Sequence, residues 1–217
     1  MRILTWNTQG SRDSAKAEEM EALIDYWVEN KDAIVIICLQ EVAAADDTIQ
    51  PLLEAKRFEC ISFKEGWNDT GRAQMIAIAQ DSGISVLGSG RVNSMNLTAD
   101  EKGQNVRIPM YCEIGLEGKR GIVYNYHAES PSSLARRSML RKVGGHVSQQ
   151  SGGYDFTAAA GDFNTNDVSE IRSVFSEFDA MHHRYDYFIT KGVTLSDGRH
   201  SEWTTSDHRP VSASMAI

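Results

Sequence analysis

The chain has 217 residues and a formal net charge of −8, with 41% hydrophobic and 24% charged residues. This length and composition are typical of one α/β domain with a substantial core, and they exclude a mini-protein or a disordered chain. The acidic balance excludes a protein that grips nucleic acid through bulk positive charge. A few arginines beside a bound cation could still hold phosphate.

Membrane insertion and disulfide bonding are not expected. No apolar run reaches the ~18 residues of a membrane-spanning helix, and the chain enters a strand directly after Arg2, without a signal peptide. Cys38, Cys60 and Cys112 form no CxxC pair, and two of them lie in apolar runs. We therefore expect reduced thiols in the core.

Hydrophobic periodicity predicts strands and helices that alternate along the chain. In chain order they are strand 2–6, helix 16–29, strand 33–39, helix 46–55, strand 58–63, loop 64–72, strands 73–79 and 84–92, loop 93–105, strands 107–116 and 119–126, helix 131–147, strand 155–160, helix 167–176, strands 178–181 and 185–190, loop 191–205 and strand 209–216. No repeat or linker divides the chain. The pattern predicts one domain, a sandwich of two sheets between helical layers.

Five short polar motifs lie at the ends of these strand-like runs. They are Thr5-Trp6-Asn7, Leu39-Gln40-Glu41, Asn125-Tyr126-His127, Gly161-Asp162-Phe163-Asn164 and Ser206-Asp207-His208. A polar side chain at the end of a buried strand is exposed at one edge of a sheet, so we expect the five motifs to meet in one cleft. Amides, carboxylates and histidines together suit metal-assisted attack of water on a phosphate ester.

In this order and spacing, from Ile3 to Val211, the motifs resemble the endonuclease/exonuclease/phosphatase superfamily. The resemblance implies a four-layer α/β/β/α fold with its active site where the two sheets splay. Within the superfamily the likeness is closest to the B subunit of cytolethal distending toxin, through residues 5–11 and 90–93 as well as the motifs. Such subunits are secreted and act with delivery subunits, which implies a leader removed before Met1. The location of the protein is otherwise left open.

Glu41 is the best candidate for a direct Mg²⁺ ligand, with Mn²⁺ as the alternative ion. Mg²⁺ prefers hard oxygen ligands and one or two carboxylates. Asn7 and Asp207 are the companions we expect beside it. The competing readings are a surface glutamate after a strand for Glu41 and a turn-capping amide for Asn7.

Asp162 and Asn164 flank Phe163, so an extended segment would place both on one side. The resemblance implies that Asp162 positions or activates the attacking water and that Asn164 donates to the phosphoryl oxygens. The structural alternative is a turn before a helix. That helix would be capped by Asn166 or Asp167, and it is compatible with the functional reading.

Two histidines are candidate proton-transfer groups. His208 can take a proton from water, and the resemblance implies that Asp186, in Tyr185-Asp-Tyr-Phe188, orients its ring. His127 resembles the second catalytic histidine of deoxyribonuclease-like members, which protonates or stabilises the leaving oxygen. Those members pair it with a glutamate on an earlier strand, and the resemblance matches that place to residues 72–74, where Gln74 stands. The amide in place of this glutamate favours the toxin branch and leaves the partner of His127 open.

Arg107 is the first choice for a phosphate-binding arginine, and Arg72 and Arg91 are weaker ones. Other basic and histidine residues carry no motif. Arg136, Arg137 and Arg141 are typical of a solvated helix face, and the adjacent residues His182 and His183 are poorly placed to chelate one ion.

The combined prediction is a Mg²⁺-dependent phosphodiesterase that nicks DNA. The alternative is a phosphatase that acts on phosphoinositides or another small phosphate ester with the same residues. A third possibility is an inert binding module, and the complete set of site residues counts against it. The loops 93–105 and 191–205 are neither strongly basic nor rich in lipid-binding aromatics. They leave the choice of substrate open.

Overall fold

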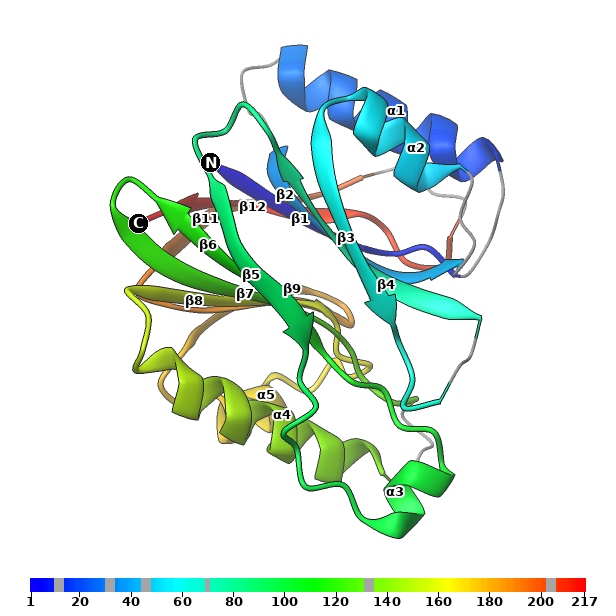
Figure 1. Cartoon of the computed structure of the whole chain (residues 1–217), viewed down its shortest axis with the longest axis vertical. Helices are drawn as coiled ribbons and strands as arrows, with labels where there is room; N and C mark the ends of the chain where they lie inside the picture. Colours follow the sequence, from blue (N-terminus) through cyan, green and yellow to red (C-terminus); the bar gives the residue numbers. More distant parts are fainter. Residues whose placement is uncertain (10–13, 30–33, 44–47, 69–70, 131–134, 202–205) are drawn as a thin grey trace.

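Two six-stranded sheets form the centre of the molecule (Figure 1). The computed structural model describes residues 1–9, 14–29, 34–43, 48–68, 71–130, 135–201 and 206–217. The strands are β1 (Arg2–Asn7), β2 (Ile34–Ala43), β3 (Phe58–Lys64), β4 (Arg72–Ala79), β5 (Ser85–Arg91), β6 (Met110–Leu116), β7 (Lys119–His127), β8 (Phe156–Asp162), β9 (Asp179–His183), β10 (Asp186–Lys191), β11 (Thr194–His200) and β12 (Val211–Ala216). The helices are α1 (Ser14–Glu29), α2 (Ile49–Ala55), α3 (Ala99–Gly103), α4 (Arg136–Ser151) and α5 (Val168–Val174).

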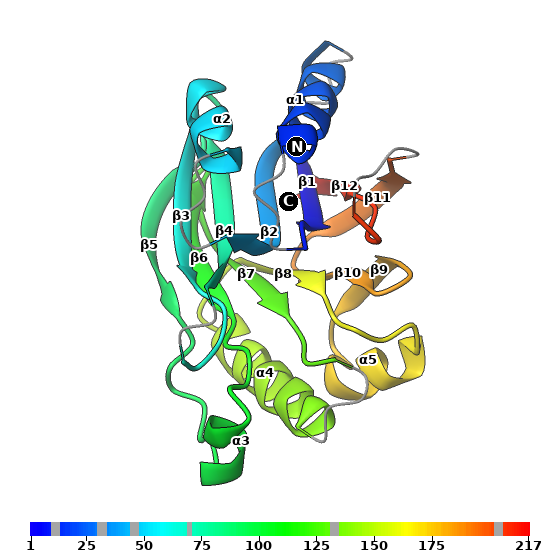
Figure 2. The same ribbon diagram turned by 90° about the vertical axis from the view of Figure 1, so that its right-hand side faces the viewer.

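The layers follow the predicted four-layer α/β/β/α order. The first sheet has the strand order β11-β12-β1-β2-β4-β3, and the second has the order β5-β6-β7-β8-β10-β9. Helices α1 and α2 cover the outer face of the first sheet, and α4 and α5 cover that of the second (Figures 1 and 2). The fold class read from the sequence is confirmed.

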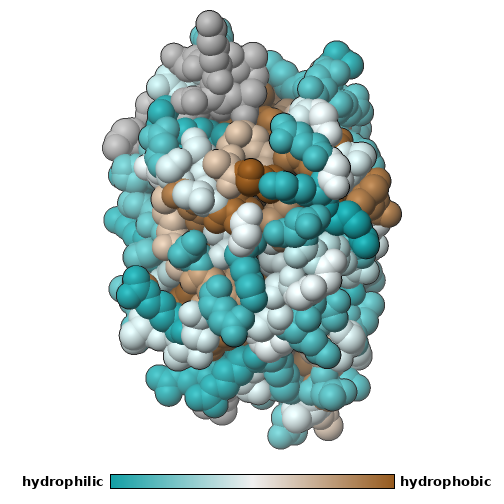
Figure 3. Space-filling view, turned by 90° about the vertical axis from the view of Figure 1, so that its left-hand side faces the viewer, coloured by the Kyte–Doolittle hydropathy of each residue, from teal (hydrophilic) through white to brown (hydrophobic). Residues whose placement is uncertain are grey.

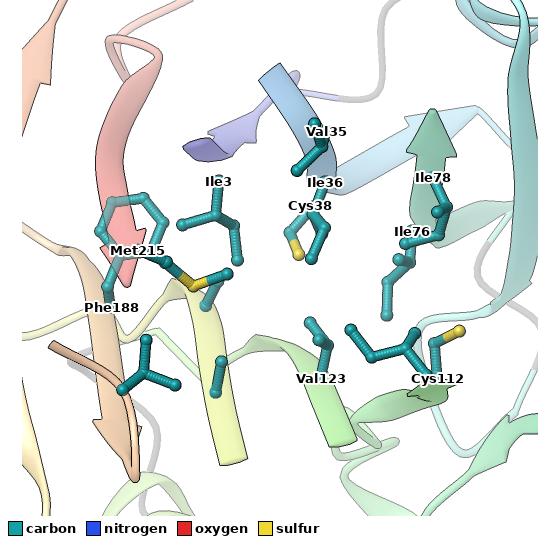
Figure 4. Packing of buried hydrophobic residues seen from close by; sticks show 14 of the residues in the cluster. Ile3, Val35, Ile36, Cys38, Ile76, Ile78, Cys112, Val123, Phe188 and Met215 are labelled. Atoms are coloured by element: carbon teal, nitrogen blue, oxygen red, sulfur yellow. The ribbon is translucent and has the colours of Figure 1, made fainter. Parts of the chain in front are cut away.

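Three apolar clusters hold these layers together. The cluster between the sheets includes Ile36, Val123 and Phe188, together with the free thiols of Cys38 and Cys112 (Figure 4). Burial raises the pKa of Cys112 to about 12, so this thiol stays protonated. The other two clusters lie beneath the outer helices. Both cysteines lie in the core, where the sequence placed them.

The central strands determine where the polar motifs meet. In the first sheet β1 pairs with β2 in parallel, and in the second sheet β7 pairs with β8 in parallel. Figure 2 views the molecule from the side on which these strands end. Parallel neighbours place their carboxyl ends at one edge of a sheet. Four of the five motifs therefore reach the same side of the sandwich.

The opposite face of the sandwich is the one on which β1 begins. Figure 3 shows hydrophobic side chains among polar ones on this face. Both chain ends lie on this side (Figure 1), and Met1 and Ile217 are partly buried against the inter-sheet cluster. Within the described part of the chain, no helix has the length and apolar character needed to cross a membrane.

Two predicted loops contain regular structure. Strand β11 falls within the loop expected at 191–205, and α3 falls within the loop expected at 93–105. Strand β11 is mostly exposed and has an irregularity between Ser196 and Arg199, so its sequence carries no alternating pattern. Other elements were predicted in place, with ends that shift by a few residues. The expected start of the fourth helix at Pro131 and the side chains of Trp27 and Val28 lie outside the described part.

Helix α3 is fixed by one buried carboxylate. The Glu101 side chain accepts hydrogen bonds from the backbone N–H of Thr98 (2.7 Å), from Ser138 Oγ (2.7 Å) and from Lys142 Nζ (2.5 Å). The Thr98 hydroxyl in turn accepts the N–H of Glu101, which completes a capping box. Burial alone would raise the pKa of Glu101, but these donors lower it to about 2.

We expect Glu101→Gln to destabilise the protein by roughly 1–3 kcal/mol at pH 7, because the buried donors lose a charged acceptor. The folded-state pKa lies below the unfolded value of about 4.3, so the charge stabilises the fold above that pH. This contribution disappears as the pH falls through 2. Urea unfolding should show the gap between wild type and variant shrinking from pH 5 to pH 2. Glu54→Gln, in an exposed side-chain pair on α2, is the control.

Candidate active site

A polar cleft of about 460 Å³ opens where the sheets splay. Its lining residues come from both sheets and from the loops that follow them. They are Asn7, Gln9, Glu41, Arg72, Arg107, His127, Ser130, Asp162, Asn164, Asp207 and His208. The structure therefore brings together residues from all five motifs, which are separated by up to two hundred positions in the sequence.

Three candidate residues form a row across the second sheet. His127 at the end of β7 is paired with Asp162 at the end of β8, and Asp162 is paired with Asp186 at the start of β10. All three side chains are almost fully buried. Strand pairing thus fixes their order and spacing, with Asp162 in the centre.

Asp162 is the hub of the cleft. Its Oδ2 accepts a hydrogen bond from Asn7 Nδ2 at 3.0 Å, which joins the first sheet to the second. The same oxygen lies 3.4 Å from His127 Nε2 and 3.5 Å from His208 Nε2. Both histidines therefore face one carboxylate oxygen.

His208 is held by Asp186. The Nδ1 atom of His208 lies 3.1 Å from Asp186 Oδ2, which leaves Nε2 facing the cleft. Burial alone would lower the pKa of His208, but the bond to Asp186 and the charges of Asp162, Asp186 and Asp207 raise it to about 9. Burial raises the pKa of Asp186 to about 6, against the opposing effect of His208. The pair therefore shares one proton tightly.

The partner of His127, which the sequence left open, is Glu65. His127 Nδ1 contacts Glu65 Oε1, and both side chains are 2% exposed. Burial alone would raise the pKa of Glu65, but the charge and hydrogen bond of His127 lower it. Gln74, at the place where the glutamate was expected, is instead buried against Ile108 O and the N–H of Met110.

Glu65 escaped the sequence reading because it directly follows strand β3 in a segment without a motif. The available signal was the one used for Glu41 and Asp162, a carboxylate at the end of a strand. Its neighbours gave no confirmation, since Lys64 and Gly66 are typical of any loop entrance. The cleft thus contains two histidine–carboxylate pairs, His208 with Asp186 and His127 with Glu65.

We expect Glu65→Gln to slow the cleavage of unactivated esters by roughly 10²-fold, within the range of a general acid. A carboxylate behind His127 stabilises the protonated ring that could give a proton to a leaving alkoxide. A p-nitrophenolate group leaves without a proton, so its release should change little. Kinetics with matched alkyl and p-nitrophenyl diesters measure this difference. Equal losses for both leaving groups would contradict the assignment. Glu113→Gln, in a carboxylate–Arg120 pair outside the cleft, is the control.

Two arginines flank Glu41. Arg72 NH1 contacts Glu41 Oε2, and Arg107 NH2 lies 3.5 Å from Glu41 Oε1. Arg107 also binds Glu65 through Nε at 3.0 Å and the carbonyl of Ala128 through NH1. Arg107 and Arg72 therefore lie at the cleft as predicted for phosphate-binding residues.

The predictions for the other arginines have different outcomes. Arg91 donates to the carbonyl of Gly66 and does not line the cleft. Arg136 is not part of a solvated face, because it is buried and bound to Glu170 through both terminal nitrogens at 2.7 and 3.0 Å. Arg137 is exposed, as expected of a solvated helix face.

A buried amide pair joins the sheets directly beneath the cleft. Gln40 Nε2 donates to Asn125 Oδ1 at 2.7 Å, and Asn125 Nδ2 donates to the carbonyls of Leu39 (2.7 Å) and Met75 (2.9 Å). Gln40 and Asn125 are fully buried. Gln40 precedes Glu41, and Asn125 lies two residues before His127. The pair thus fixes the distance between the strands that carry two of the candidate residues.

Backbone geometry around Asp162 departs from the extended segment that the sequence suggested. Asn164 has φ of 49°, its N–H donates to Asp162 Oδ1 at 2.8 Å, and its amide donates to Ala128 O at 2.9 Å. The two side chains still meet because the chain turns back on itself. Gly161 has φ of 145°, and a Cβ there would lie 1.9 Å from the carbonyl oxygen of Tyr126. Only glycine fits. Asp167 caps α5, as one of the two predicted alternatives.

The cleft offers oxygen donors of the kind that a hard divalent cation prefers. The Glu41 carboxylate is 12% exposed and faces the cleft, and Asn7 Oδ1 accepts one hydrogen bond, from Gln9 N–H at 3.0 Å, among those described. Asp207 lines the same cleft with a side chain that is 70% exposed. Two clusters bring carboxylate and imidazole atoms within 4.8 Å, Glu41–Glu65–His127 and Asp162–Asp186–His208. In each cluster one carboxylate already binds the histidine, which leaves Glu41 in the first and Asp162 in the second. Glu41 is the more accessible of the two, with a side chain 12% exposed against 1% for Asp162, and is therefore the better-placed candidate ligand.

The comparison with family models decides the class of this site. The model of the endonuclease/exonuclease/phosphatase family matches residues 4–208, nearly the whole chain. The chain belongs to this family. Its members are metal-dependent phosphoesterases and nucleases, so a phosphoesterase with a divalent metal is the class in which the cleft belongs.

Solved structures of low sequence identity share the fold. The catalytic domain of human Nocturnin is 18% identical, with a TM-score of 0.75, and the match covers 100% of this chain and 93% of that one. D. rerio TDP2 complexed with a single-strand DNA product is 17% identical (TM-score 0.75, coverage 100% and 99%). A mannosyl-6-phosphatase from Bacteroides thetaiotaomicron is also 17% identical (TM-score 0.75, coverage 100% and 100%). No curated protein matches the chain.

Proposed function

We propose that this protein is a divalent-metal-dependent phosphodiesterase that cleaves the DNA backbone. The observation that carries the diester assignment is the position of Arg72 and Arg107. Both line the cleft, and both also line a second cavity of about 470 Å³. A phosphate held between two cavities has room for an organic group on each side. A diester has two such groups and a monoester has one.

The attack step is assigned to Asp162, His208 and Asp186. Water held on Asp162 Oδ2 would lie beside His208 Nε2, which is 3.5 Å from that oxygen. His208 in its neutral form takes the proton, and Asp186 holds the ring and stabilises the positive charge that develops. Asn164 and Arg107 donate to the phosphoryl oxygens and orient them for displacement.

The departure step is assigned to His127 and Glu65. His127 Nε2 faces the cleft between Glu41 Oε1 (3.6 Å) and Asp162 Oδ2 (3.4 Å). With Glu65 behind its other nitrogen, the ring can hold a proton at Nε2 and give it to the leaving oxygen. A divalent cation bound at Glu41, with Asn7 and Asp207 beside it, would supply Lewis-acid stabilisation of the phosphoryl charge.

DNA is favoured as the diester by the likeness to the toxin B subunit at residues 5–11 and 90–93. A neighbour of the same fold is also known with a DNA product bound. The competing substrate is a small phosphate ester. It is favoured by the net charge of −8 and by a fold neighbour that is a sugar phosphatase.

Supercoiled-plasmid nicking with Mg²⁺ or EDTA, run beside phosphate release from a phosphoinositide panel, tests the proposal. We expect nicking that depends on metal and on His208. His146→Ala is the matched control, because that histidine contacts Ser94 and Tyr124 away from the cleft. Phosphate release from a headgroup without detectable nicking would replace DNA by the small ester.

A further inference from the structure

A second cavity adjoins the cleft and has no role in the steps described above. It is lined by Glu65, Gly66, Arg72, Gln104, Asn105, Arg107, Glu129 and Ser130, and we call it the side pocket. Its volume of about 470 Å³ is close to the 460 Å³ of the cleft, and the two cavities share Arg72, Arg107 and Ser130. A group attached to a phosphate at these arginines can therefore extend into it.

Two chain segments pair to form the walls of the side pocket. Gly66 forms an antiparallel β-bridge with Arg107, Trp67 N donates to Val106 O at 2.8 Å, and Ile108 N donates to Glu65 O at 2.8 Å. Asn105 has φ of 53°, and its Oδ1 accepts the N–H of Asn68 at 2.5 Å. The walls are thus fixed before a ligand arrives, which lowers the entropic cost of binding.

Among the described residues that line the side pocket, Glu129 is the carboxylate that neither histidine uses. It is 7% exposed, its Oε1 accepts the backbone N–H of Arg107, and its Oε2 lies 3.3 Å from the hydroxyl of Tyr126. These contacts hold the carboxylate in place and leave each oxygen with further acceptor capacity. A buried carboxylate held in this way can accept a further hydrogen bond from a ligand donor.

The lining residues limit the chemistry of the occupant. Within the part of the chain that the structure describes, the lining residues are all polar, charged or glycine, and none has an apolar side chain. Apolar ligands bind in cavities lined mainly by hydrophobic side chains, with few polar groups. An acyl chain or an unsubstituted aryl ring would leave these polar groups without ligand partners. Carboxylates and amides instead match the hydroxyl and amino groups of sugars and nucleobases.

We infer that the side pocket binds the organic group esterified to the scissile phosphate, and that this group is a compact ring bearing hydroxyl or amino donors. The inference rests on the proposed phosphodiesterase function, because it needs a phosphate at Arg72 and Arg107. Glu129 and Asn105 then determine specificity without taking part in bond cleavage. A nucleoside and a cyclitol both present this chemistry.

Competitive inhibition separates this role from a structural one. Bis(p-nitrophenyl) phosphate serves as the reporter substrate, and thymidine 5′-phosphate, inositol 1-phosphate and phenyl phosphate serve as inhibitors. A monoester has one organic group, which can enter the side pocket. The test therefore does not depend on which of the two groups of a diester leaves during cleavage. In the wild type we expect one of the two donor-bearing monoesters to inhibit roughly tenfold better than phenyl phosphate, the preference that one or two hydrogen bonds provide. The stronger inhibitor of the two shows whether the side pocket prefers a nucleoside or a cyclitol.

Glu129→Gln keeps an oxygen acceptor for Arg107 but loses the charge. It should abolish most of that preference while leaving reporter turnover and phenyl phosphate inhibition within about twofold. Asn105→Gly, which keeps the positive φ and removes the amide, should act in the same direction. Glu113→Gln is the control. A uniform loss for all ligands, or an undiminished preference in both variants, would overturn the assignment.

Calorimetric titration of the same monoesters in Mg²⁺ makes the test independent of turnover. If the protein binds donor-bearing monoesters selectively, loses this selectivity in Glu129→Gln and hydrolyses no diester, the side-pocket assignment stands and the phosphodiesterase function is wrong. If the protein hydrolyses the reporter but shows no preference among the monoesters, the phosphodiesterase function stands and the side-pocket assignment is wrong.

Discussion

Replacing His208 by alanine is expected to lower kcat/KM by roughly 10²- to 10⁴-fold, the range of a general base. His208 Nε2 is 3.5 Å from Asp162 Oδ2, so its loss removes the proposed proton acceptor for a water held on Asp162. His208 is partly exposed at the cleft, and unfolding by urea should change little. His146→Ala, away from the cleft, should keep full activity.

Asp186→Ala should reproduce much of this loss, because Asp186 acts through His208. The double variant should be barely worse than either single variant, since residues that act as a unit give non-additive losses. Steady-state kinetics on the four proteins measure the coupling. Losses that multiply would show that the 3.1 Å contact between His208 and Asp186 has no part in the chemistry.

The pH profile gives an independent readout of the same pair. A base must be neutral to accept a proton, so activity should fall as the pH drops below the pKa of His208. The surrounding carboxylates raise this pKa to about 9, and a bound cation would offset part of their effect. We expect an ascending limb at or below about pH 9 in the wild type. This limb should be absent from the residual activity of His208→Ala.

Much of the cleft could be predicted from the sequence because a polar residue at the end of an apolar run is easily recognised. Asn7, His127 and Asp162 each end a buried apolar run. Parallel pairing of such runs places their carboxyl ends at the same edge of a sheet. Asp186 depended on a resemblance, since it begins its strand. The strand order and register decided the rest, and neither follows from local sequence.

Glu65 and the side pocket show where this reasoning stops. Glu65 becomes the partner of His127 because the segment after β3 is bridged to Arg107 and contacts the end of β7, and these parts of the chain are distant in sequence. Helix α3 did carry a local signal, the Thr98–Glu101 capping box, and could have been found from it. A cavity between two loops cannot be predicted from the sequence unless the pairing of those loops is known.

Glu41→Gln is expected to weaken divalent metal binding by roughly tenfold or more, because it removes the best-placed carboxylate from the cleft. The substitution keeps the shape of the side chain and an oxygen for Arg72 and Arg107, so the fold should survive. Glu54→Gln on α2 is the matched control.

Metal binding can be measured without turnover. A ligand at about 100 times its Kd stabilises a protein by about 2.7 kcal/mol, and tenfold weaker binding reduces this to about 1.4 kcal/mol. Urea unfolding with and without Mg²⁺ or Mn²⁺ should therefore show a smaller metal-induced gain for Glu41→Gln than for the wild type and for Glu54→Gln. Activity of Glu41→Gln should fall in parallel and recover in part at higher metal concentration. Full wild-type activity in excess EDTA would remove the metal from the mechanism. An unchanged metal-induced gain in Glu41→Gln would instead move the ion to other carboxylates, with the Asp162–Asp186–His208 cluster as the next place to look.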